Sequence, residues 1–324
     1  YIYIYIIIII INNTMKEFEN QVAVITGAAS GLGYAIAEEC IRRKMKTVLT
    51  DFDSNSLQIA YTSFQKKYPG SNLLQLVIDV TKTEDMQRMH DETIKAFGKV
   101  HLLFSNAGAG GPPSMFAPKN SWDWILKLNL ISVIDGMRIF VPTMIKQQEP
   151  AYVVATASIY GLHTGHRPYG VTKQAVVATC EAMQLELKEM GIRHVNIASL
   201  CPSWIQTNIA ANSIKYEEND DAKMELERQV GIEWFKRHAA PVQTVVDAFF
   251  EGVENERNYF HTHLDHSRLF FESRVDNILE HQKIDDNEGF KEYFRNQMKQ
   301  REVIAKELMA KRSQKGKVAV KSKM

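Results

Sequence analysis

Short apolar runs alternate with longer amphipathic stretches along most of the chain. The apolar runs, which we interpret as strands, lie at 21–26, 46–51, 72–79, 100–105, 151–158, 193–200 and 258–263. The stretches between them repeat apolar residues at helical spacing over 31–44, 54–68, 83–97, 121–147 and 169–190. Ser54 is the expected N-cap of the second helix, and Gly191 ends the last.

The strand segments are nearly continuous apolar runs, which is typical of strands that are buried on both faces. Strands that alternate with helices indicate repeated βαβ units with right-handed crossovers. The pattern therefore predicts an α/β fold, a Rossmann-type doubly wound sheet of mainly seven parallel strands with helices on both faces. Ligands of such sheets bind beyond the carboxyl ends of the strands, so we expect the chemistry immediately after each strand.

The first residues, YIYIYIIIIIINNT, differ from the rest of the sequence. This run is too short to span a membrane, and it lacks the basic segment and cleavage site of a secretory signal. We interpret residues 1–14 as a low-complexity leader outside the fold, of the kind that translated AT-rich repeats would give. A genuine apolar tail that binds a membrane or associates with itself is the alternative.

Composition returns to normal at Met15, and we expect the catalytic domain to span residues 15–262. The segment after the sixth strand, about 204–240, mixes apolar and charged residues and is interpreted as a mobile lid. Two further helical patterns form a predicted C-terminal helical extension over 263–310. Residues 311–324 are basic and lack aromatic and acidic side chains, which predicts a disordered tail.

The chain has 324 residues, 45% of them hydrophobic, and a net charge of +1. This balance gives no indication of nucleic acid or an anionic membrane as a partner. The cysteines, Cys40, Cys180 and Cys201, are far apart, so we expect neither a disulfide framework nor a metal site. No later run is long and apolar enough to predict a membrane span, and a cytoplasmic location is expected.

A glycine-rich turn, TGAASGLG, follows the first strand and opens the first helix. Gly27, Gly31 and Gly33 would permit a tight turn and close approach of the backbone to a pyrophosphate. The helix N-terminus would offer unpaired N–H groups to that phosphate. An ordinary strand–helix turn is the alternative, but the position after the first strand favours a dinucleotide site.

Asp51 ends the second strand, where an acid would accept the hydroxyl groups of an adenosine ribose. Its neighbour Phe52 is not basic, and neither is Ser30 beside Gly31, so no cation would balance a 2′-phosphate. We therefore predict NAD in preference to NADP. Asp53 is expected only to cap the next helix.

Ser158 follows the fifth strand, and Tyr169 and Lys173 lie four residues apart in the next helix. Residues four apart share one helix face, so the Lys173 ammonium would lie beside the Tyr169 phenol. A neighbouring positive charge lowers the pKa of a phenol, which could then exchange a proton with a substrate oxygen. Ser158 would hydrogen-bond the same oxygen. A tyrosine and a lysine at this spacing also occur by chance, and the accompanying motifs favour the catalytic interpretation.

Together these motifs resemble those of the classical short-chain dehydrogenase/reductase family, over about residues 16–260. TGAASGLG is similar to its TGxxxGxG, IDVT at 78–81 to its DVT, and SNAG at 105–108 to its NNAG. LNL at 128–130 is similar to its VNL, and CPSWIQT at 201–207 to its PGxxxT. The sequence differs from the family pattern at Ser105, in place of asparagine, and at Ser203, in place of glycine.

The resemblance implies a role for each matching residue. The catalytic residues would be Ser158, Tyr169, Lys173 and Asn129, with Asn129 holding a water that connects Lys173 to solvent. The cofactor would be held by Gly27, Ser30, Gly31, Leu32, Gly33, Asp51, Phe52, Asp79, Val80, Asn106, Ala107, Gly108, Tyr169, Lys173, Pro202, Ile205 and Thr207. Asp79 and Val80 would flank the adenine, Asn106 would stabilise the sheet, and Ile205 with Thr207 would hold the carboxamide.

The resemblance implies hydride transfer between NAD and a small-molecule alcohol or ketone, in a homodimer or homotetramer packed through helices 121–147 and 169–190. The alternative is a catalytically silent NAD-binding scaffold or sensor, although all four catalytic positions are filled. His163, His166 and Arg167 lie between Ser158 and Tyr169 and could contact a polar group of the substrate. Ordinary surface-loop residues are the simpler interpretation of these three.

Overall fold

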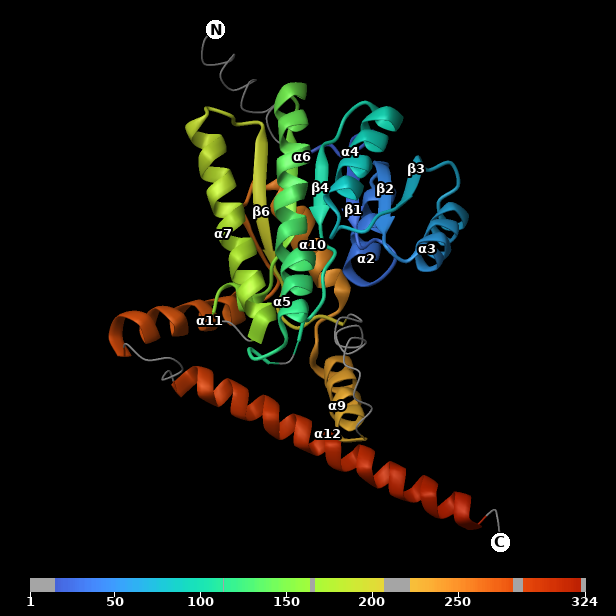
Figure 1. Cartoon of the computed structure of the whole chain (residues 1–324), viewed down its shortest axis with the longest axis vertical. Coiled ribbons are helices and arrows are strands. Elements are labelled where there is room, and N and C mark those ends of the chain that lie inside the picture. Colours follow the sequence, from blue (N-terminus) through green and yellow to red (C-terminus); the bar gives the residue numbers. More distant parts are fainter. Residues whose placement is uncertain (1–14, 113, 164–166, 207–221, 282–287, 322–324) are drawn as a thin grey trace.

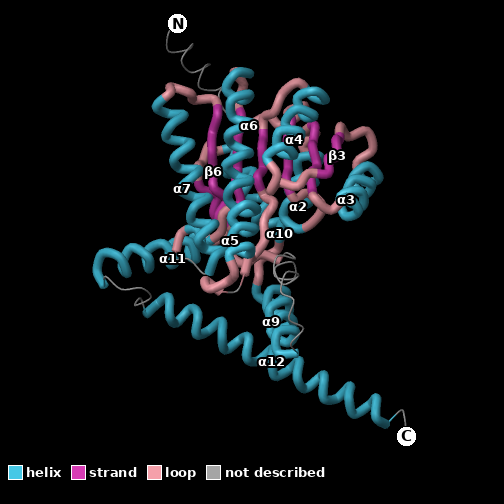
Figure 2. The backbone as a smooth tube through the Cα atoms, viewed as in Figure 1, coloured by secondary structure: helices cyan, strands magenta, loops and turns pink. Residues whose placement is uncertain are grey.

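Seven parallel strands form one sheet in the order β3-β2-β1-β4-β5-β6-β7 in the computed structural model of the chain (Figure 2). The structure describes residues 15–112, 114–163, 167–206, 222–281 and 288–321. The strands are β1 Val22–Thr26, β2 Lys46–Asp51, β3 Leu73–Val77, β4 Leu102–Ser105, β5 Ala151–Thr156, β6 Val195–Cys201 and β7 Tyr259–His261. The order reverses between β1 and β4, which places the expected binding crevice beyond their carboxyl ends.

Helices cover both faces of the sheet, as Figure 1 shows. They are α2 Gly31–Arg42, α3 Ser54–Lys67, α4 Thr83–Phe97, α5 Lys119–Leu126, α6 Ser132–Gln147, α7 Arg167–Glu189, α9 Ala222–His238, α10 Val242–Glu254, α11 Leu264–Asp276 and α12 Glu288–Lys321. Short turns of other helix types are η1 Lys127–Ile131, η2 Ile159–Gly161 and η3 Asn277–His281. The predicted doubly wound α/β fold with a C-terminal helical extension is confirmed.

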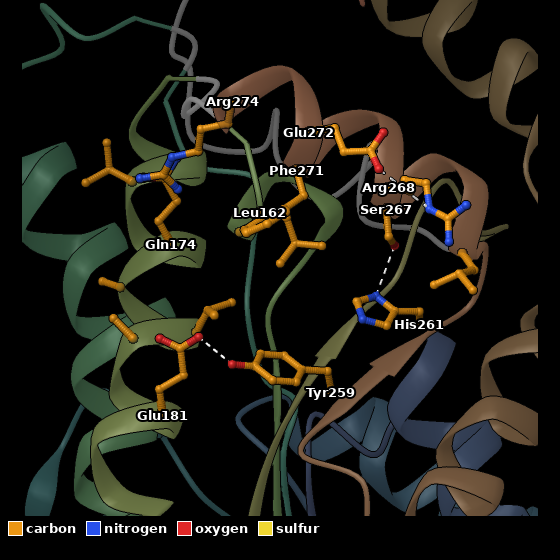
Figure 3. Close-up of a pocket in the computed structure, with 16 residues that line it drawn as sticks. Leu162, Gln174, Glu181, Tyr259, His261, Ser267, Arg268, Phe271, Glu272 and Arg274 are labelled. Carbon is orange, nitrogen blue, oxygen red and sulfur yellow. Dashed lines mark hydrogen bonds and ion pairs between the residues drawn. The ribbon is translucent and has the colours of Figure 1, made fainter. Parts of the chain in front are cut away.

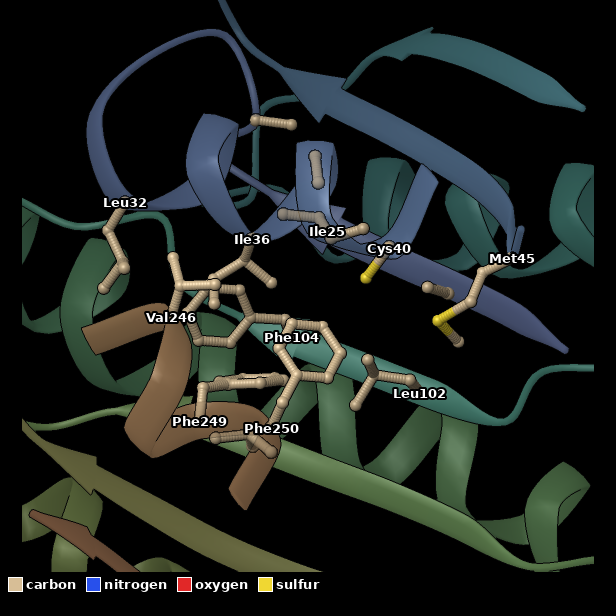
Figure 4. Close-up of a cluster of buried hydrophobic side chains, with 14 of the residues drawn as sticks. Ile25, Leu32, Ile36, Cys40, Met45, Leu102, Phe104, Val246, Phe249 and Phe250 are labelled. Carbon is tan, nitrogen blue, oxygen red and sulfur yellow. The ribbon is translucent and has the colours of Figure 1, made fainter. Parts of the chain in front are cut away.

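The two faces of the sheet carry separate apolar cores. Alternate residues of β1 point to opposite faces, with Ile25 in one core and Val24 in the other. The first core packs side chains of α2, α3 and α10, including Ile36 and Phe249, against strand residues such as Phe104. The rings of Phe104 and Phe249 lie side by side in Figure 4, with centroids 4.9 Å apart. The second core packs side chains of α4, α6 and α7. Burial on both faces explains the continuous apolar strands of the sequence.

The start of the described chain belongs to the first core. Met15 is 2% exposed, and Phe18 packs edge-to-face against Phe250 with ring centroids 5.3 Å apart. The side chains of these residues therefore hold the segment before β1 against α10. Residues 1–14, which we interpreted as a leader, lie outside the described residues.

One local prediction was wrong. Asp53, not Ser54, is the N-cap of α3, and its carboxylate accepts hydrogen bonds from the N–H groups of Asn55 and Ser56 at 3.0 and 3.1 Å. Ser54 is already the first helical residue. Both aspartate and serine are good caps, and the extended backbone of Asp53 places its side chain toward the free N–H groups.

The predicted long helix over 121–147 is continuous but not uniform. It starts at Lys119, and a π-helical turn, η1, separates α5 from α6. By length and composition this helix, Lys119–Gln147, is the one described helix that could cross a membrane. Half of its most apolar window is buried inside the protein, as expected for a core helix that packs against the sheet.

The helices after β7 lie beyond the carboxyl ends of the strands, together with α9 (Figure 1). Residues of α11 and α12 share apolar clusters with Tyr169 and Trp204. The helix α12 continues to Lys321, so the unstructured tail that we predicted from residue 311 differs from the structure. The segment contains one glycine and no proline, and lysine, alanine and glutamine are compatible with a helix.

Candidate active site

The glycine-rich turn has the backbone geometry that a dinucleotide site requires. Gly27 and Gly31 have φ angles of +68° and +57°, which glycine adopts without strain. A Cβ atom on Gly33 would lie 2.1 Å from the carbonyl oxygen of Gly27, so α2 packs against the turn only because residue 33 is glycine. The turn and the start of α2 therefore fit a pyrophosphate, since the backbone can approach closely.

The two residues on either side of Gly31 differ in exposure. Ser30 is the exposed N-cap of α2, and its side chain makes no capping hydrogen bond. Its hydroxyl is therefore available to a ligand beside the N-terminal N–H groups of the helix. Leu32 is buried in the first core and positions the turn rather than facing solvent.

Asp51 lies at the end of β2 and bonds to the glycine-rich turn. Its carboxylate accepts hydrogen bonds from the N–H groups of Ala29 and Asp53, both at 3.2 Å. Burial raises the pKa of Asp51, and the backbone hydrogen bonds oppose that shift. The adjacent Phe52 is 71% exposed, so its ring is accessible to a ligand beside the carboxylate.

Asp79 and Val80 follow β3. The Asp79 carboxylate accepts hydrogen bonds from the N–H and hydroxyl groups of Thr81 at 3.0 and 2.7 Å. Burial raises the pKa of Asp79, but the bonds from Thr81 and the charge of Lys82 outweigh it, so the net pKa is lowered. Val80 is buried. Asp79 therefore fixes the turn after β3 as an anion.

The segment after β4 connects three neighbouring strands. The side-chain amide of Asn106 donates to the carbonyl of Thr26 at 3.1 Å, and its oxygen accepts from the hydroxyl of Thr156 at 3.2 Å. Ala107 donates its N–H to the hydroxyl of Thr26 at 3.0 Å. A Cβ on Gly108 would lie 3.0 Å from Oδ1 of Asn129. These contacts join β1, β4 and β5 at the carboxyl edge.

Ser105 precedes this segment and is the first departure from the family pattern. Its hydroxyl is buried and has no hydrogen-bond partner among the described residues. The small side chain fits against Gly136 of α6, where a Cβ on that glycine would lie 3.1 Å from the hydroxyl. A longer amide side chain would crowd this contact.

Asn129 lies in the π-helical turn and is completely buried. Its amide group donates to the carbonyl of Ala109 at 2.9 Å and to the hydroxyl of Thr172 at 3.2 Å, and its oxygen accepts from the N–H of Ala109 at 3.0 Å. The extra residue of a π-turn directs Asn129 toward α7 and the loop after β4. Such turns often mark functional sites in helices.

Ser158 and Tyr169 meet beyond the end of β5. Ser158 is buried, accepts a hydrogen bond from the N–H of Tyr160 at 3.3 Å, and hydrogen-bonds the Tyr169 side chain. Burial raises the pKa of Tyr169, and the bond to Ser158 lowers it by a smaller amount. Tyr169 therefore retains its proton near neutral pH in the chain alone.

Lys173 lies one helical turn beyond Tyr169, with Nζ 5.6 Å from the centroid of that ring. Nζ donates to the carbonyl of Thr156 at 2.5 Å. Burial lowers the pKa of Lys173 to about 8. In the chain alone the charge of Lys173 does not lower the pKa of Tyr169, because Nζ contacts the β5 carbonyl and burial of the phenol prevails.

The segment after β6 is only partly described. Pro202 accepts a hydrogen bond from the N–H of Ile159 at 2.9 Å, and Ile205 pairs with Ala240 in an isolated parallel bridge. Thr207 lies outside the described residues. Ser203, the second departure from the family pattern, donates its N–H to the hydroxyl of Thr262 at 3.1 Å and bonds His266 at 2.8 Å. These bonds connect the segment to β7 and α11.

A group of aromatic side chains covers this edge of the site, and sequence reasoning did not predict it. We call Tyr160, Trp204, Trp234, Phe270 and Tyr293 the aromatic roof. The Tyr160 ring lies 6.4 Å from that of Tyr169, 5.6 Å from Trp204 and 5.9 Å from Phe270, centroid to centroid. Trp204 donates to the hydroxyl of Tyr293 at 2.8 Å. The spacing of aromatic residues in the segment that forms α12 was the sequence signal that could have predicted this group.

A separate pocket of about 920 Å³ lies on the outer side of α7 (Figure 3). Residues of α7, β7 and α11 line it, among them Gln174, Glu181, Tyr259 and Phe271. Ser158, Tyr169 and Lys173 are not among its lining residues. In the part of the chain that the structure describes, no group of histidine, cysteine and acidic residues could hold a metal ion.

Comparisons with known proteins agree with this geometry. The sequence profile of the short chain dehydrogenases matches residues 21–218. The chain is 31% identical to the CLA biosynthesis dehydrogenase/reductase of Lactiplantibacillus plantarum, covering 82% of this chain and 95% of the relative. It is 30% identical to a C alpha-dehydrogenase of Sphingobium sp., covering 76% and 81%.

Solved structures extend the similarity to the fold. A short chain dehydrogenase/reductase from Burkholderia phymatum, crystallised in complex with NAD, superposes with a TM-score of 0.75 and 32% sequence identity. The match covers 84% of this chain and 99% of that one. The protein is thus an oxidoreductase whose relatives use a nicotinamide cofactor, and the chain belongs to the short-chain dehydrogenase family.

Proposed function

We propose that this protein is an NAD-dependent dehydrogenase or reductase that interconverts a secondary alcohol and a ketone. The observation that carries the proposal is that Ser158, Tyr169 and Lys173 come together beyond the end of β5, with Lys173 Nζ 5.6 Å from the centroid of the Tyr169 ring and the Ser158 side chain acting on the Tyr169 phenol. Tyr169 has its proton near neutral pH and can donate it to a carbonyl oxygen. In the opposite direction the phenolate would accept the proton of an alcohol.

The other polar groups position these atoms. The Ser158 hydroxyl would hydrogen-bond the reacting oxygen and fix it beside Tyr169. The Lys173 ammonium would stabilise negative charge on the phenol, and a pKa of about 8 lets it exchange protons near neutrality. The Asn129 amide hydrogen-bonds Ala109 in the loop after β4 and the hydroxyl of Thr172 in α7. It therefore connects this loop with the catalytic helix.

The bound nicotinamide would supply the site that accepts or donates hydride. The glycine-rich turn and the start of α2 would hold the pyrophosphate, and Asp51 would accept bonds from the adenosine ribose. Val80 and Asp79 would flank the adenine, and Pro202 and Ile205 would border the nicotinamide. The partly buried Asp51 carboxylate would repel a 2′-phosphate, which favours NAD over NADP.

We also expect a cytoplasmic homo-oligomer. The outer surface of α7 exposes the apolar side chains of Val171 and Leu185, and exposed Met190 follows the helix. These side chains would pack against a second copy. Size-exclusion chromatography with light scattering tests this expectation. A monomer at micromolar concentration would contradict it.

The proposed function is tested by initial rates with a panel of secondary alcohols and ketones, each with NAD(H) and NADP(H). We expect turnover with NAD and at least about tenfold weaker use of NADP, because one buried carboxylate disfavours the added phosphate. Asp51→Asn should reduce that preference, while Asp53→Asn, which changes only the cap of α3, should not. A preference for NADP in the wild type would overturn the cofactor assignment.

A further inference from the structure

Arg301 of α12 is a cation beside the aromatic roof that has no ion-pair partner among the described residues. Its guanidinium carbon lies 5.4 Å from the centroid of the Trp234 ring. Its Nε atom is buried and has no hydrogen-bond partner, and no acidic side chain forms an ion pair with it among the described residues. Arg301 as a whole is partly buried. A partly buried cation without an anion is unfavourable, and a protein that retains one often uses it for a ligand.

The other arginines of this region illustrate the contrast. Arg295, two turns earlier on α12, pairs with Glu288 at 2.7 Å, and Arg237 of α9 pairs with Glu233 and Glu307 at 3.0 and 2.8 Å. Acidic partners are therefore available on these helices, and Arg301 makes none of these pairs. The helix itself does not neutralise its charge.

A second cation lies at the start of the catalytic helix α7. Arg167 begins α7, two residues before Tyr169, and has a φ angle of +62°, a strained value for arginine. Burial raises the pKa of Tyr160, while Arg301 and Arg167 both lower it, so both charges act on one hydroxyl. Burial lowers the pKa of Arg301, and the charge of Arg167 lowers it further.

The Arg301 guanidinium lies beside the Trp234 ring, and its Nε atom has no hydrogen-bond partner among the described residues. A guanidinium that stacks on an indole uses its face, whereas its N–H groups point outward in the plane. That planar edge matches the two oxygens of a carboxylate. The charge of Arg301 also acts on the Tyr160 hydroxyl, and the Tyr160 ring lies 6.4 Å from that of Tyr169, centroid to centroid.

We propose that Arg301 binds a carboxylate of the substrate, which makes the substrate a hydroxy acid or a keto acid. This inference rests on the proposed dehydrogenase function and specifies its substrate class. The aromatic roof lies between the cation and Tyr169 and would contact the apolar part of such a molecule. The C-terminal extension thereby supplies a specificity residue for a reaction that the sheet edge performs.

A binding experiment tests the subsite without turnover. Octanoate and octanamide, which share size but not charge, are titrated calorimetrically into the full chain with NAD present. We expect octanoate to bind at least about tenfold more tightly, since a charge-assisted bidentate contact is stronger than a neutral one. Arg301→Gln should remove the difference and Arg301→Lys should retain part of it. The matched control is Lys299→Gln, which removes an exposed charge from the same helix.

Two results would overturn the proposal: equal binding or no binding of octanoate by the wild type, or the same loss in Lys299→Gln as in Arg301→Gln. Thermal unfolding separates binding from a structural role. Arg301→Met should leave Tm unchanged or raise it, because an unpaired buried charge is removed. A Tm lowered by several degrees would assign Arg301 to the fold instead.

Kinetics distinguish this inference from the proposed function. Secondary hydroxyalkanoic acids and their methyl esters are compared with NAD as the oxidant. We expect the wild type to favour the acids through a lower KM, and Arg301→Gln to raise KM for the acids only. Turnover of esters and acids with equal kcat/KM would contradict the carboxylate subsite alone. No turnover of any alcohol or ketone in the panel would contradict the proposed function.

Discussion

The sheet edge and the aromatic roof lie against each other but are built differently. At the sheet edge, Asn129 and Lys173 each donate to backbone carbonyls, and the network is completely buried. In the roof, rings meet edge-to-face, and the guanidinium of Arg301 has no acidic partner among the described residues. A buried, hydrogen-bonded network fixes the geometry that proton transfer needs, whereas a cation without an ion-pair partner is open to recognition.

Tyr169→Phe should have the largest effect on the activity of the sheet edge. Removing the phenolic oxygen should lower kcat by about a thousandfold or more, because no other described side chain replaces the acid. NAD affinity should change little, since the glycine-rich turn is untouched. The measurements are steady-state rates and NADH fluorescence titration, with the surface variant Tyr61→Phe as control. Activity within tenfold of wild type would refute the assigned role.

Lys173→Met should reveal the energetic cost of burying the Lys173 ammonium at the sheet edge. The pKa of Lys173 is about 8 in the folded chain against an ordinary value of 10.5, so the unfolded chain binds more protons between these values. Wild-type stability should therefore rise with pH across this window. The variant should be more stable at pH 7, by up to about 3 kcal/mol.

That advantage should disappear as the pH approaches 10.5, the ordinary value for lysine. Urea unfolding at several pH values measures it. The exposed control Lys66→Met should show no such pH dependence. A stability difference that stays constant with pH would mean that the buried ammonium retains an ordinary pKa.

Gly33→Ala should damage the sheet edge, whereas Gly231→Ala should not damage the roof. The new Cβ at Gly33 would lie 2.1 Å from a backbone oxygen, while the space around Gly231 in α9 is open. We expect about 1–3 kcal/mol of destabilisation and weaker NADH binding for the first change. The second should be neutral or stabilising by less than about 1 kcal/mol. Equal effects on Tm would contradict this distinction.

Tyr293→Phe should produce the smallest effect and test the roof alone. The variant removes the acceptor of the Trp204 indole N–H at 2.8 Å and leaves the ring in place. We expect about 1 kcal/mol of destabilisation, with kcat nearly unchanged. Chemical denaturation and steady-state rates measure both quantities. A large loss of kcat with unchanged stability would show that the roof takes part in chemistry.

The sequence predicted the sheet edge well because each feature there depends on local chemistry. The strands are recognisable in the sequence as continuous apolar runs, because they are buried on both faces. The helix over Thr83–Phe97 was predicted with correct bounds. The positions of Gly27, Gly33 and Asp51 follow from the requirements of a strand–turn–helix unit. Ser158, Tyr169 and Lys173 lie near one another because successive elements end at the same edge.

The rest depends on contacts between distant segments. Trp204 and Tyr293 are far apart in sequence, and nothing in either segment specifies that they meet. The raised pKa of Tyr169 in the chain alone could not be predicted from the sequence, because burial is a property of the assembled core. The π-turn at Asn129 also follows from packing of the long helix on the sheet rather than from its residues.

The contacts of α12 with the lid region repeat at intervals of seven residues. Tyr293 bonds Trp204, Gln300 bonds Trp234, and Glu307 pairs with Arg237. Because seven residues make about two helical turns, one face of α12 is fixed against the core. A single inserted residue before Gln300 would rotate Arg301 by about 100°. Evolution could thus alter substrate choice by shifting the phase of one helix, while every residue of the catalytic edge stayed the same.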